Sequence, residues 1–181
     1  MRRLIFQEFV TLDGYAAAAD GSLDFFGTVT DQDDQDNLAL LESVDTMLLG
    51  AATYRIFVDY WPTATDPLAP GLNALRKVVV SSTLDAAPWG EWEPGEVVTD
   101  AVADVTALKA EDGKDIVLWG SISLFHTLLA AGLVDEVQLR VCPTVIGAGK
   151  PVFPQGEFAM DLIDAGPWAT NGVLLRYRPV S

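Results

Sequence analysis

The chain has 181 residues, of which half are hydrophobic and a fifth are charged, and its formal net charge is −15 at neutral pH. This length fits one domain with a sizeable core, so we expect a single domain spanning residues 1–181. The negative charge disfavours binding to nucleic acid or to an anionic membrane, because the chain has no excess of basic residues with which to replace their counterions. The single cysteine, Cys142, excludes an internal disulfide and favours a reducing compartment, so we expect a cytoplasmic protein.

Apolar runs alternate with helical patterns along most of the chain. In chain order the sequence predicts strand 4–10, loop 11–27, helix 30–44 with Thr30 as its N-cap, strand 47–50, helix 52–60, strand 77–81, helix 100–112, strand 115–120, helix 121–131, strand 134–147, and a C-terminal strand pair around the turn at Asn171-Gly172. Strands that alternate with helices and end in an antiparallel pair indicate an α/β fold, with a mostly parallel central sheet and flanking helices.

Three of the predicted strands end in small or hydroxylated residues: Gly50, Ser81-Ser82-Thr83, and Gly120-Ser121. In parallel sheets, ligands bind beyond the carboxyl ends of the strands. The N–H groups of a helix that begins there can face an anion, such as a phosphate group. Each end has an ordinary alternative, namely a tight corner, a turn or a plain N-cap, so the combination of the three carries the prediction of a binding site.

The residue types that could supply other chemistry are scarce. His126 is the only histidine, which argues against a multi-histidine metal site, so we expect no metal. Cys142 lies in an apolar run and is expected to be a buried, inert thiol. Among the many acids, Asp13 and Asp34 are the catalytic candidates. Their alternatives are a turn with Gly14 for Asp13 and a helix-dipole partner for Asp34.

Taken in order, five segments resemble a known family: FVTLDGYAA, LLGAATY, VVVSSTL, LWGSISLFHTLLAAGLVDEVQL and PTVIGAGKPVF. Together they look like the dihydrofolate reductase-like superfamily, and within it the branch that contains the riboflavin biosynthesis reductase (RibD C-terminal) domain. The resemblance runs from about residue 3 to residue 178. It implies a dihydrofolate reductase-like fold, a homodimer, NADPH as the hydride donor and a flat nitrogen heterocycle as the acceptor.

The resemblance also implies roles for residues of this sequence. Those expected to bind the cofactor are Ala16, Ala17, Gly50, Ala51, Thr53, Ser81, Ser82, Thr83, Trp119, Gly120, Ser121 and Ile122. Aromatic residues expected to stack on the substrate are Phe25, Phe26, Tyr54 and Phe57. Asp34 lies before Gly50 at the spacing of the acid that folate reductases carry, and we expect Asp34, Asp13 or water to supply the proton.

One position departs from the family pattern. The family usually has an arginine after the glycine of the first strand end, where it assists the 2′-phosphate of NADPH, and this chain has Ala51. NADH therefore stays open as the cofactor, unless Arg55 or Lys77 takes the place of that arginine.

The sequence thus predicts an NAD(P)H-dependent reductase of a pterin-, pyrimidine- or related nitrogen heterocycle, similar to 5-amino-6-(5-phosphoribosylamino)uracil reductase. The alternatives are a non-catalytic nucleotide-binding or dimeric interaction protein that keeps the fold, and a purely structural dimer with an empty cleft.

Overall fold

The computed structural model describes residues 1–28 and 35–180. In chain order the elements are β1 (Leu4–Thr11), β2 (Tyr15–Ala18), η1 (Asp24–Thr28), α1 (Gln35–Ser43), β3 (Val44–Gly50), α2 (Ala51–Tyr60), η2 (Trp61–Thr63), α3 (Ala69–Ala74), β4 (Arg76–Val80), β5 (Ala87–Trp89), β6 (Trp92–Val98), α4 (Ala101–Ala110), β7 (Asp115–Trp119), α5 (Ile122–Ala130), β8 (Glu136–Cys142), β9 (Gly149–Pro151), β10 (Met160–Trp168) and β11 (Gly172–Pro179).

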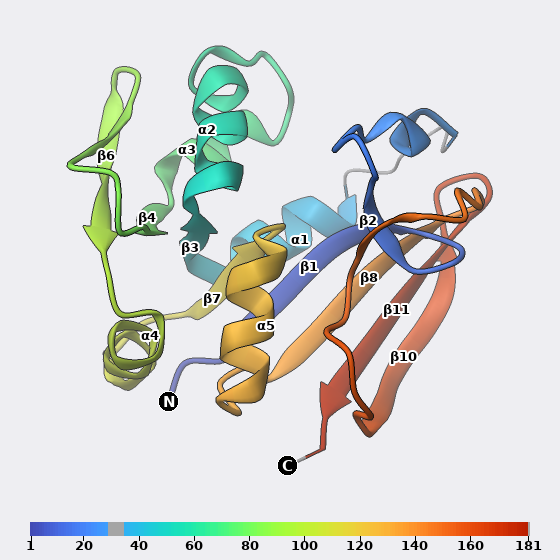
Figure 1. The fold of residues 1–181 in the computed structure, drawn as a ribbon. Coiled ribbons are helices and arrows are strands. Elements are labelled where there is room, and N and C mark those ends of the chain that lie inside the picture. The colour runs from blue at the N-terminus through green and yellow to red at the C-terminus, as the bar shows by residue number, and fades with distance from the viewer. Residues whose placement is uncertain (29–34, 181) are drawn as a thin grey trace.

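The strands of residues 1–28 and 35–180 form one large sheet and one small one. The large sheet has nine strands in the order β10-β11-β8-β1-β7-β3-β4-β6-β5, and β2 pairs with β9 in the small one. The strands from β8 through β6 run parallel, whereas β5, β10 and β11 run antiparallel to their neighbours. This confirms the predicted α/β fold, with its mostly parallel sheet and antiparallel C-terminal strands (Figure 1).

Helices cover both faces of the large sheet. On one face, Leu4 and Phe6 of β1 pack against α4 and α5, and the rings of Phe6 and Phe125 stack with their centroids 3.7 Å apart. This contact follows from the apolar spacing in α5, whose buried residues include Ile122, Phe125 and Leu129. Figure 1 shows α4 and α5 in front of the sheet.

The opposite face carries a second apolar cluster. Met47 and Leu49 of β3 pack there against residues of α1, α2 and α3. Side chains of a strand alternate between its two faces, so β3 contributes Leu48 to the first cluster and its neighbours to the second. Among residues 1–28 and 35–180, no helix combines the length and the apolar character needed to cross a membrane.

Some boundaries differ from the sequence-based expectation. The strand expected over 134–147 ends at Cys142, because Pro143 has no N–H group to donate to a strand ladder. Val44, expected to end a helix, begins β3, so α1 ends at Ser43. The expected N-cap, Thr30, lies outside the described residues. The strands β2, β5, β6 and β9 are too short or too irregular in pattern to be predicted from the sequence.

The small sheet, β2 with β9, brings two segments that are far apart in sequence to one side of β1. Ala18 pairs with Gly149, and the backbone N–H of Val152 donates to the carbonyl of Gly14 at 3.0 Å. The strands approach so closely that a methyl group on Gly149 would overlap the backbone carbonyl oxygen of Ala17. Glycine at position 149 is therefore required for this pairing.

Replacing Gly149 by alanine is expected to displace β9 from β2. Overpacking of this kind lowers the free energy of unfolding by about 1–3 kcal/mol, measurable from urea denaturation. Gly166 in β10 is the matched control, because a methyl group there would meet no atom within 4 Å. If Gly149→Ala and Gly166→Ala shift the urea midpoint equally, the close approach of β2 and β9 is not what requires glycine.

Candidate active site

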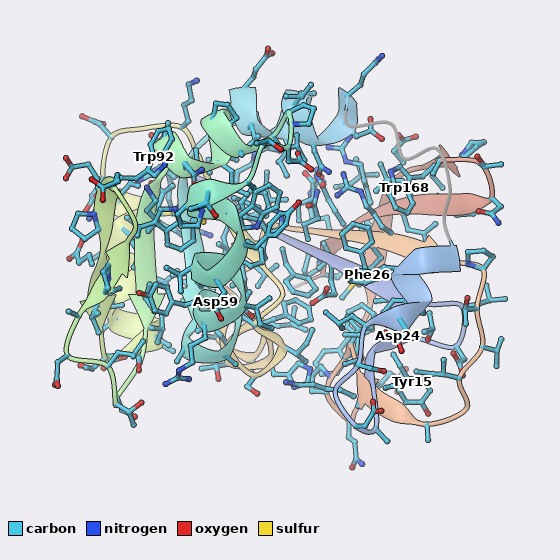
Figure 2. All side chains as sticks on the ribbon, turned by 90° about the horizontal axis from the view of Figure 1, so that it is seen from above. Tyr15, Asp24, Phe26, Asp59, Trp92 and Trp168 are labelled. Atoms are coloured by element: carbon cyan, nitrogen blue, oxygen red, sulfur yellow. The ribbon has the colours of Figure 1, made fainter. Side chains whose placement is uncertain are left out.

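A cavity of about 810 Å³ opens at the carboxyl ends of β1, β3 and β7. Its walls come from the first turns of α2 and α5, from β2, from residues 21–26 and from Lys150 in β9. Figure 2 looks onto this end of the sheet, with Asp59 of α2 and Phe26 of η1 on opposite sides of it. The position agrees with the expectation for a parallel sheet.

Two strand ends at the cavity are joined through Ser121. The backbone N–H of Gly50 donates to Ser121 Oγ at 2.8 Å, and the backbone N–H of Ser121 donates to Thr53 Oγ1 at 3.0 Å. Ser121 Oγ in turn donates to the carbonyl of Trp119 at 3.0 Å. The corner after β3 and the corner after β7 thus hold each other in place, and we call this arrangement the Ser121 bridge.

The second corner has an uncommon backbone conformation. Gly120 and Ser121 both have φ of 54°, in the left-handed region that favours glycine. A methyl group on Gly120 would lie only 3.1 Å from Thr53 Oγ1. Ser121 adopts the same conformation with a side chain, at an energetic cost. The hydrogen bonds of the Ser121 bridge offset that cost.

The helices that follow these corners begin without side-chain caps. Gly50 and Ser121 are the N-cap residues of α2 and α5, and neither helix start has a side-chain capping hydrogen bond. In α4, by contrast, Asp100 accepts from the N–H of Ala103. The first-turn residues of α2 and α5 line the cavity. First-turn N–H groups have no partner within their own helix, so two helix starts are arranged to receive an anion.

Comparison with known proteins assigns the chain to a family. The family model of the RibD C-terminal domain matches residues 2–174. The chain belongs to this family. It is 32% identical over 157 residues to the uncharacterized protein YyaP of Bacillus subtilis (strain 168). The aligned segment covers 84% of this chain and 80% of that protein.

Solved structures agree with the family in fold. A putative riboflavin biosynthesis protein from Shewanella sp. PV-4 superposes with a TM-score of 0.79 at 21% identity, over 99% of both chains. Dihydrofolate reductase from Enterococcus faecalis, complexed with NADP(H) and RAB-propyl, superposes with a TM-score of 0.66 at 14% identity, over 99% of this chain and 97% of that chain. The fold is therefore dihydrofolate reductase-like, as the sequence predicted.

The cavity of this RibD C-terminal domain brings together most of the residues that the sequence predicts to bind cofactor or substrate. The residues that line it are Ala16, Ala17, Phe26, Gly50, Ala51, Thr53, Phe57, Trp119, Gly120, Ser121 and Ile122. They come from β2, η1, β3, α2, β7, the corner after β7 and α5, which are separated in sequence by up to about a hundred residues. The structure therefore brings two of the three strand ends to one site.

The third strand end forms a turn beside the cavity. Val80 lines the cavity, but Ser81, Ser82 and Thr83 do not. Ser81 is buried, and its Oγ accepts from the N–H groups of Thr83 and Leu84, each at 3.1 Å. This is the ordinary turn that the sequence analysis held as the alternative.

Two of the four aromatic candidates also lie elsewhere. Tyr54 is buried on the α2 side of the sheet, where its hydroxyl donates to the carbonyl of Pro88 at 2.7 Å. Phe25 packs in a small cluster with Cys142 and Trp168. Both residues stabilise the walls behind the cavity and do not line it.

Asp13, one of the two acids named from the sequence, does not line the cavity. Asp13 accepts from the hydroxyl of Thr11 at 2.7 Å and from the N–H of Gly147 at 2.8 Å. The Thr11 hydroxyl is the chief cause that holds the pKa of Asp13 below its ordinary value, so this carboxyl is an ionised acceptor that fastens two loops. Asp34, the other candidate, lies outside the described residues.

Sequence reasoning missed Glu8, in the middle of β1. Glu8 and Lys150 are the only lining residues in the described part of the chain with an ionisable carboxyl or amine. Burial raises the pKa of Glu8 to about 8, although the N–H of Phe9 and the charge of Lys150 both act to lower it. The alternation of Glu8 with Phe6 and Val10 was the available signal in the sequence. These two residues lie on the same face of β1 and belong to the core.

Removing the Ser121 hydroxyl should destabilise the folded protein. Ser121→Ala leaves the Gly50 N–H without its acceptor, and the free energy of unfolding is expected to fall by about 1–3 kcal/mol. The matched control is Ser123→Ala, at an exposed position two residues later, with an expected change within about 0.5 kcal/mol. Equal urea midpoints for the two variants would contradict the role of the Ser121 bridge.

The stability of the Glu8→Gln variant relative to the wild type should increase as the pH rises. The pKa of Glu8 is about 8 in the folded chain against an ordinary value of 4.5, so between these values ionisation favours the unfolded chain. The stability of Glu8→Gln relative to the wild type should grow by at most about 1.4 kcal/mol per pH unit across that window and level off above it. Glu91→Gln, at an exposed position, is the control in the same urea titrations. A difference independent of pH would contradict the raised pKa.

Proposed function

We propose that the protein is an NAD(P)H-dependent reductase that transfers a hydride to a pterin-, pyrimidine- or related nitrogen heterocycle. The observation that carries this proposal is the pair of uncapped helix starts, α2 and α5, on one cavity of about 810 Å³. A dinucleotide has two linked phosphates, which suit two adjacent N–H clusters. Dihydrofolate reductase from Enterococcus faecalis, which has this fold, is complexed with NADP(H).

The lining residues fit a flat cofactor beside a flat substrate. Small residues, among them Ala16, Gly50 and Gly120, allow close approach of the ligand to the backbone. Phe26 and Phe57 supply apolar walls, and Phe57 lies against Trp119 with their ring centroids 6.1 Å apart. The volume lies in the range of small-molecule and cofactor sites, about 300–1,000 Å³.

A bound dihydronicotinamide would supply the hydride. The chain's own residues would hold the two ligands face to face, so that proximity and orientation contribute much of the rate. The backbone N–H groups of Ala51 and Ile122 belong to the first turns that would hold the phosphates. The apolar side chains of Phe26 and Phe57 would exclude water from the reacting atoms.

The choice between NADPH and NADH depends on Arg55. Lys77 is buried, and its Nζ donates to the carbonyl of Asn73, so it is not available to a ligand. Arg55 is exposed, and its Nη1 donates to the carbonyl of Ala51 at 3.4 Å. The guanidinium of Arg55 therefore lies at Ala51, where the family usually has an arginine. In this proposal Arg55 recognises the 2′-phosphate and favours NADPH.

The test is a titration with NADPH and with NADH, followed by tryptophan fluorescence, since Trp61 and Trp119 line the cavity. NADPH consumption is then measured with a panel of C=N and C=O heterocycles that includes 7,8-dihydropterin. Saturable binding with hydride transfer to a panel member is the expected result. Absence of saturable binding by either cofactor overturns the proposal, and binding without hydride transfer favours the non-catalytic nucleotide-binding protein.

Arg55→Ala should weaken the binding of NADPH and leave the binding of NADH nearly unchanged. The Kd for NADPH is expected to rise about tenfold, the lower end of what a charge-assisted hydrogen bond contributes, while the Kd for NADH changes less than about twofold. Arg178→Ala, at an exposed position in β11, removes the same charge as a control. If Arg55→Ala weakens both cofactors equally, Arg55 does not recognise the 2′-phosphate.

A further inference from the structure

Glu8 occupies a position in β1 where an apolar residue would cost less. Its neighbours on the same face, Phe6 and Val10, are buried in the core cluster that α5 covers. Burying a carboxyl group is unfavourable unless hydrogen bonds or a charge offset the loss of water. A carboxyl retained at such a position, in the wall of a cavity, indicates a role toward a ligand.

The two oxygens of Glu8 have different surroundings. Oε1 accepts a hydrogen bond from the backbone N–H of Phe9 at 2.9 Å, which fixes the orientation of the carboxyl group. Oε2 lies on the side of the β7 corner, since a methyl group on Gly120 would be 3.6 Å from it. The absence of a side chain at Gly120 therefore leaves Oε2 facing the space between Glu8 and the Ser121 bridge.

Among the residues that line the cavity, one carries a charge that acts on Glu8. Lys150 in β9 is the lining residue whose positive charge acts on it. The lining residues from β2, from the β7 corner and from α5 carry no ionisable side chain, namely Ala16, Ala17, Trp119, Ser121, Ser123 and Thr127. Because burial raises the pKa of Glu8 to about 8, the carboxyl group is mostly protonated at neutral pH and has a proton to donate.

We propose that Glu8 is the proton donor of the reductase, acting through Oε2 on the heteroatom of the substrate's C=N or C=O bond. This rests on the proposed function. The π bond breaks as its carbon takes the hydride from the dihydronicotinamide and its nitrogen or oxygen takes the Oε2 proton. The nicotinamide is oxidised, the heterocycle is reduced, and Glu8 becomes a carboxylate that takes a proton from water. The positive charge of Lys150 stabilises that carboxylate.

Of Asp13 and Glu8, the two candidate acids that the structure describes, Glu8 is better suited to the proton-donor role. Asp13 is ionised and holds Gly147 outside the cavity, so it has neither the proton nor the position. Glu8 has both, and its Oε1 is already held by Phe9. The carboxyl group therefore needs no rearrangement before it acts on a substrate.

The first part of the experiment measures the proton itself, without cofactor or substrate. Infrared difference spectra of the wild type and Glu8→Gln are recorded from pH 6 to pH 9. A carboxylic-acid carbonyl band that is lost with a midpoint near pH 8 in the wild type, and is absent from Glu8→Gln, is expected. A wild-type protein with no such band at pH 6 overturns the proposal, because Glu8 then has no proton to give.

The second part separates chemistry from binding. With NADPH and 7,8-dihydropterin, or the panel member that the wild type reduces fastest, hydride transfer by Glu8→Gln should fall at least about a hundredfold, since general acids contribute about 10²–10⁴. Its Kd for NADPH should stay within about threefold of the wild type, because glutamine has the same shape. The wild-type rate should fall above about pH 8, and the residual rate of Glu8→Gln should not.

Glu91→Gln, at an exposed position that does not line the cavity, should retain the wild-type rate and pH profile. Wild-type hydride transfer with an equal rate in Glu8→Gln overturns the role of Glu8 and leaves the reductase standing. No saturable binding of NADPH or NADH by the wild type overturns the reductase, and the role of Glu8 with it.

Discussion

The site depends on the Ser121 bridge, in which one serine joins the corner after β3 to the corner after β7. Its Oγ accepts a hydrogen bond from the N–H of Gly50, and its own N–H donates to Thr53 Oγ1. The polar groups of the two corners therefore satisfy each other. The cost is the left-handed conformation of Ser121, which follows Gly120 in the same conformation. The result is that α2 and α5 begin side by side, with their first-turn N–H groups left for a ligand.

Backbone dipoles matter here because the chain is so acidic. A net charge of −15 would repel an anionic ligand from a distance. At physiological salt, however, exposed charges are screened beyond about 8 Å, whereas helix N–H groups act at contact. In the proposed reductase, the two helix starts, with Arg55 and Lys150 nearby, would hold phosphate within a negative protein. In α4 the corresponding position is occupied by the Asp100 carboxylate, so that helix offers no such seat.

The fold and the meeting of two strand ends at one cavity were predictable because both follow from local patterns. Buried strands that end in Gly50 and Gly120 have a recognisable composition, and parallel strands bring such ends together. Ser81 has the same local pattern but satisfies its own turn, which only the three-dimensional structure can reveal. Glu8 was missed because nothing within LIFQEFV distinguishes a carboxyl group that faces a cavity from one that faces solvent. Its place in the cavity wall is shared with α5, which begins more than a hundred residues later.

Gly120 is where the two halves of the site meet. The space that its side chain would fill lies 3.1 Å from Thr53 Oγ1 on one side and 3.6 Å from Glu8 Oε2 on the other. A side chain there would strain the backbone, press on the Ser121 bridge and close the approach to Oε2. In the proposed reductase the same glycine would keep open both the phosphate site and the approach to Glu8, so that a hydride donor bound there would lie beside a proton donor. A corner built only to turn the chain from a strand into a helix would need neither the uncapped helix starts nor a half-buried carboxyl group beside them.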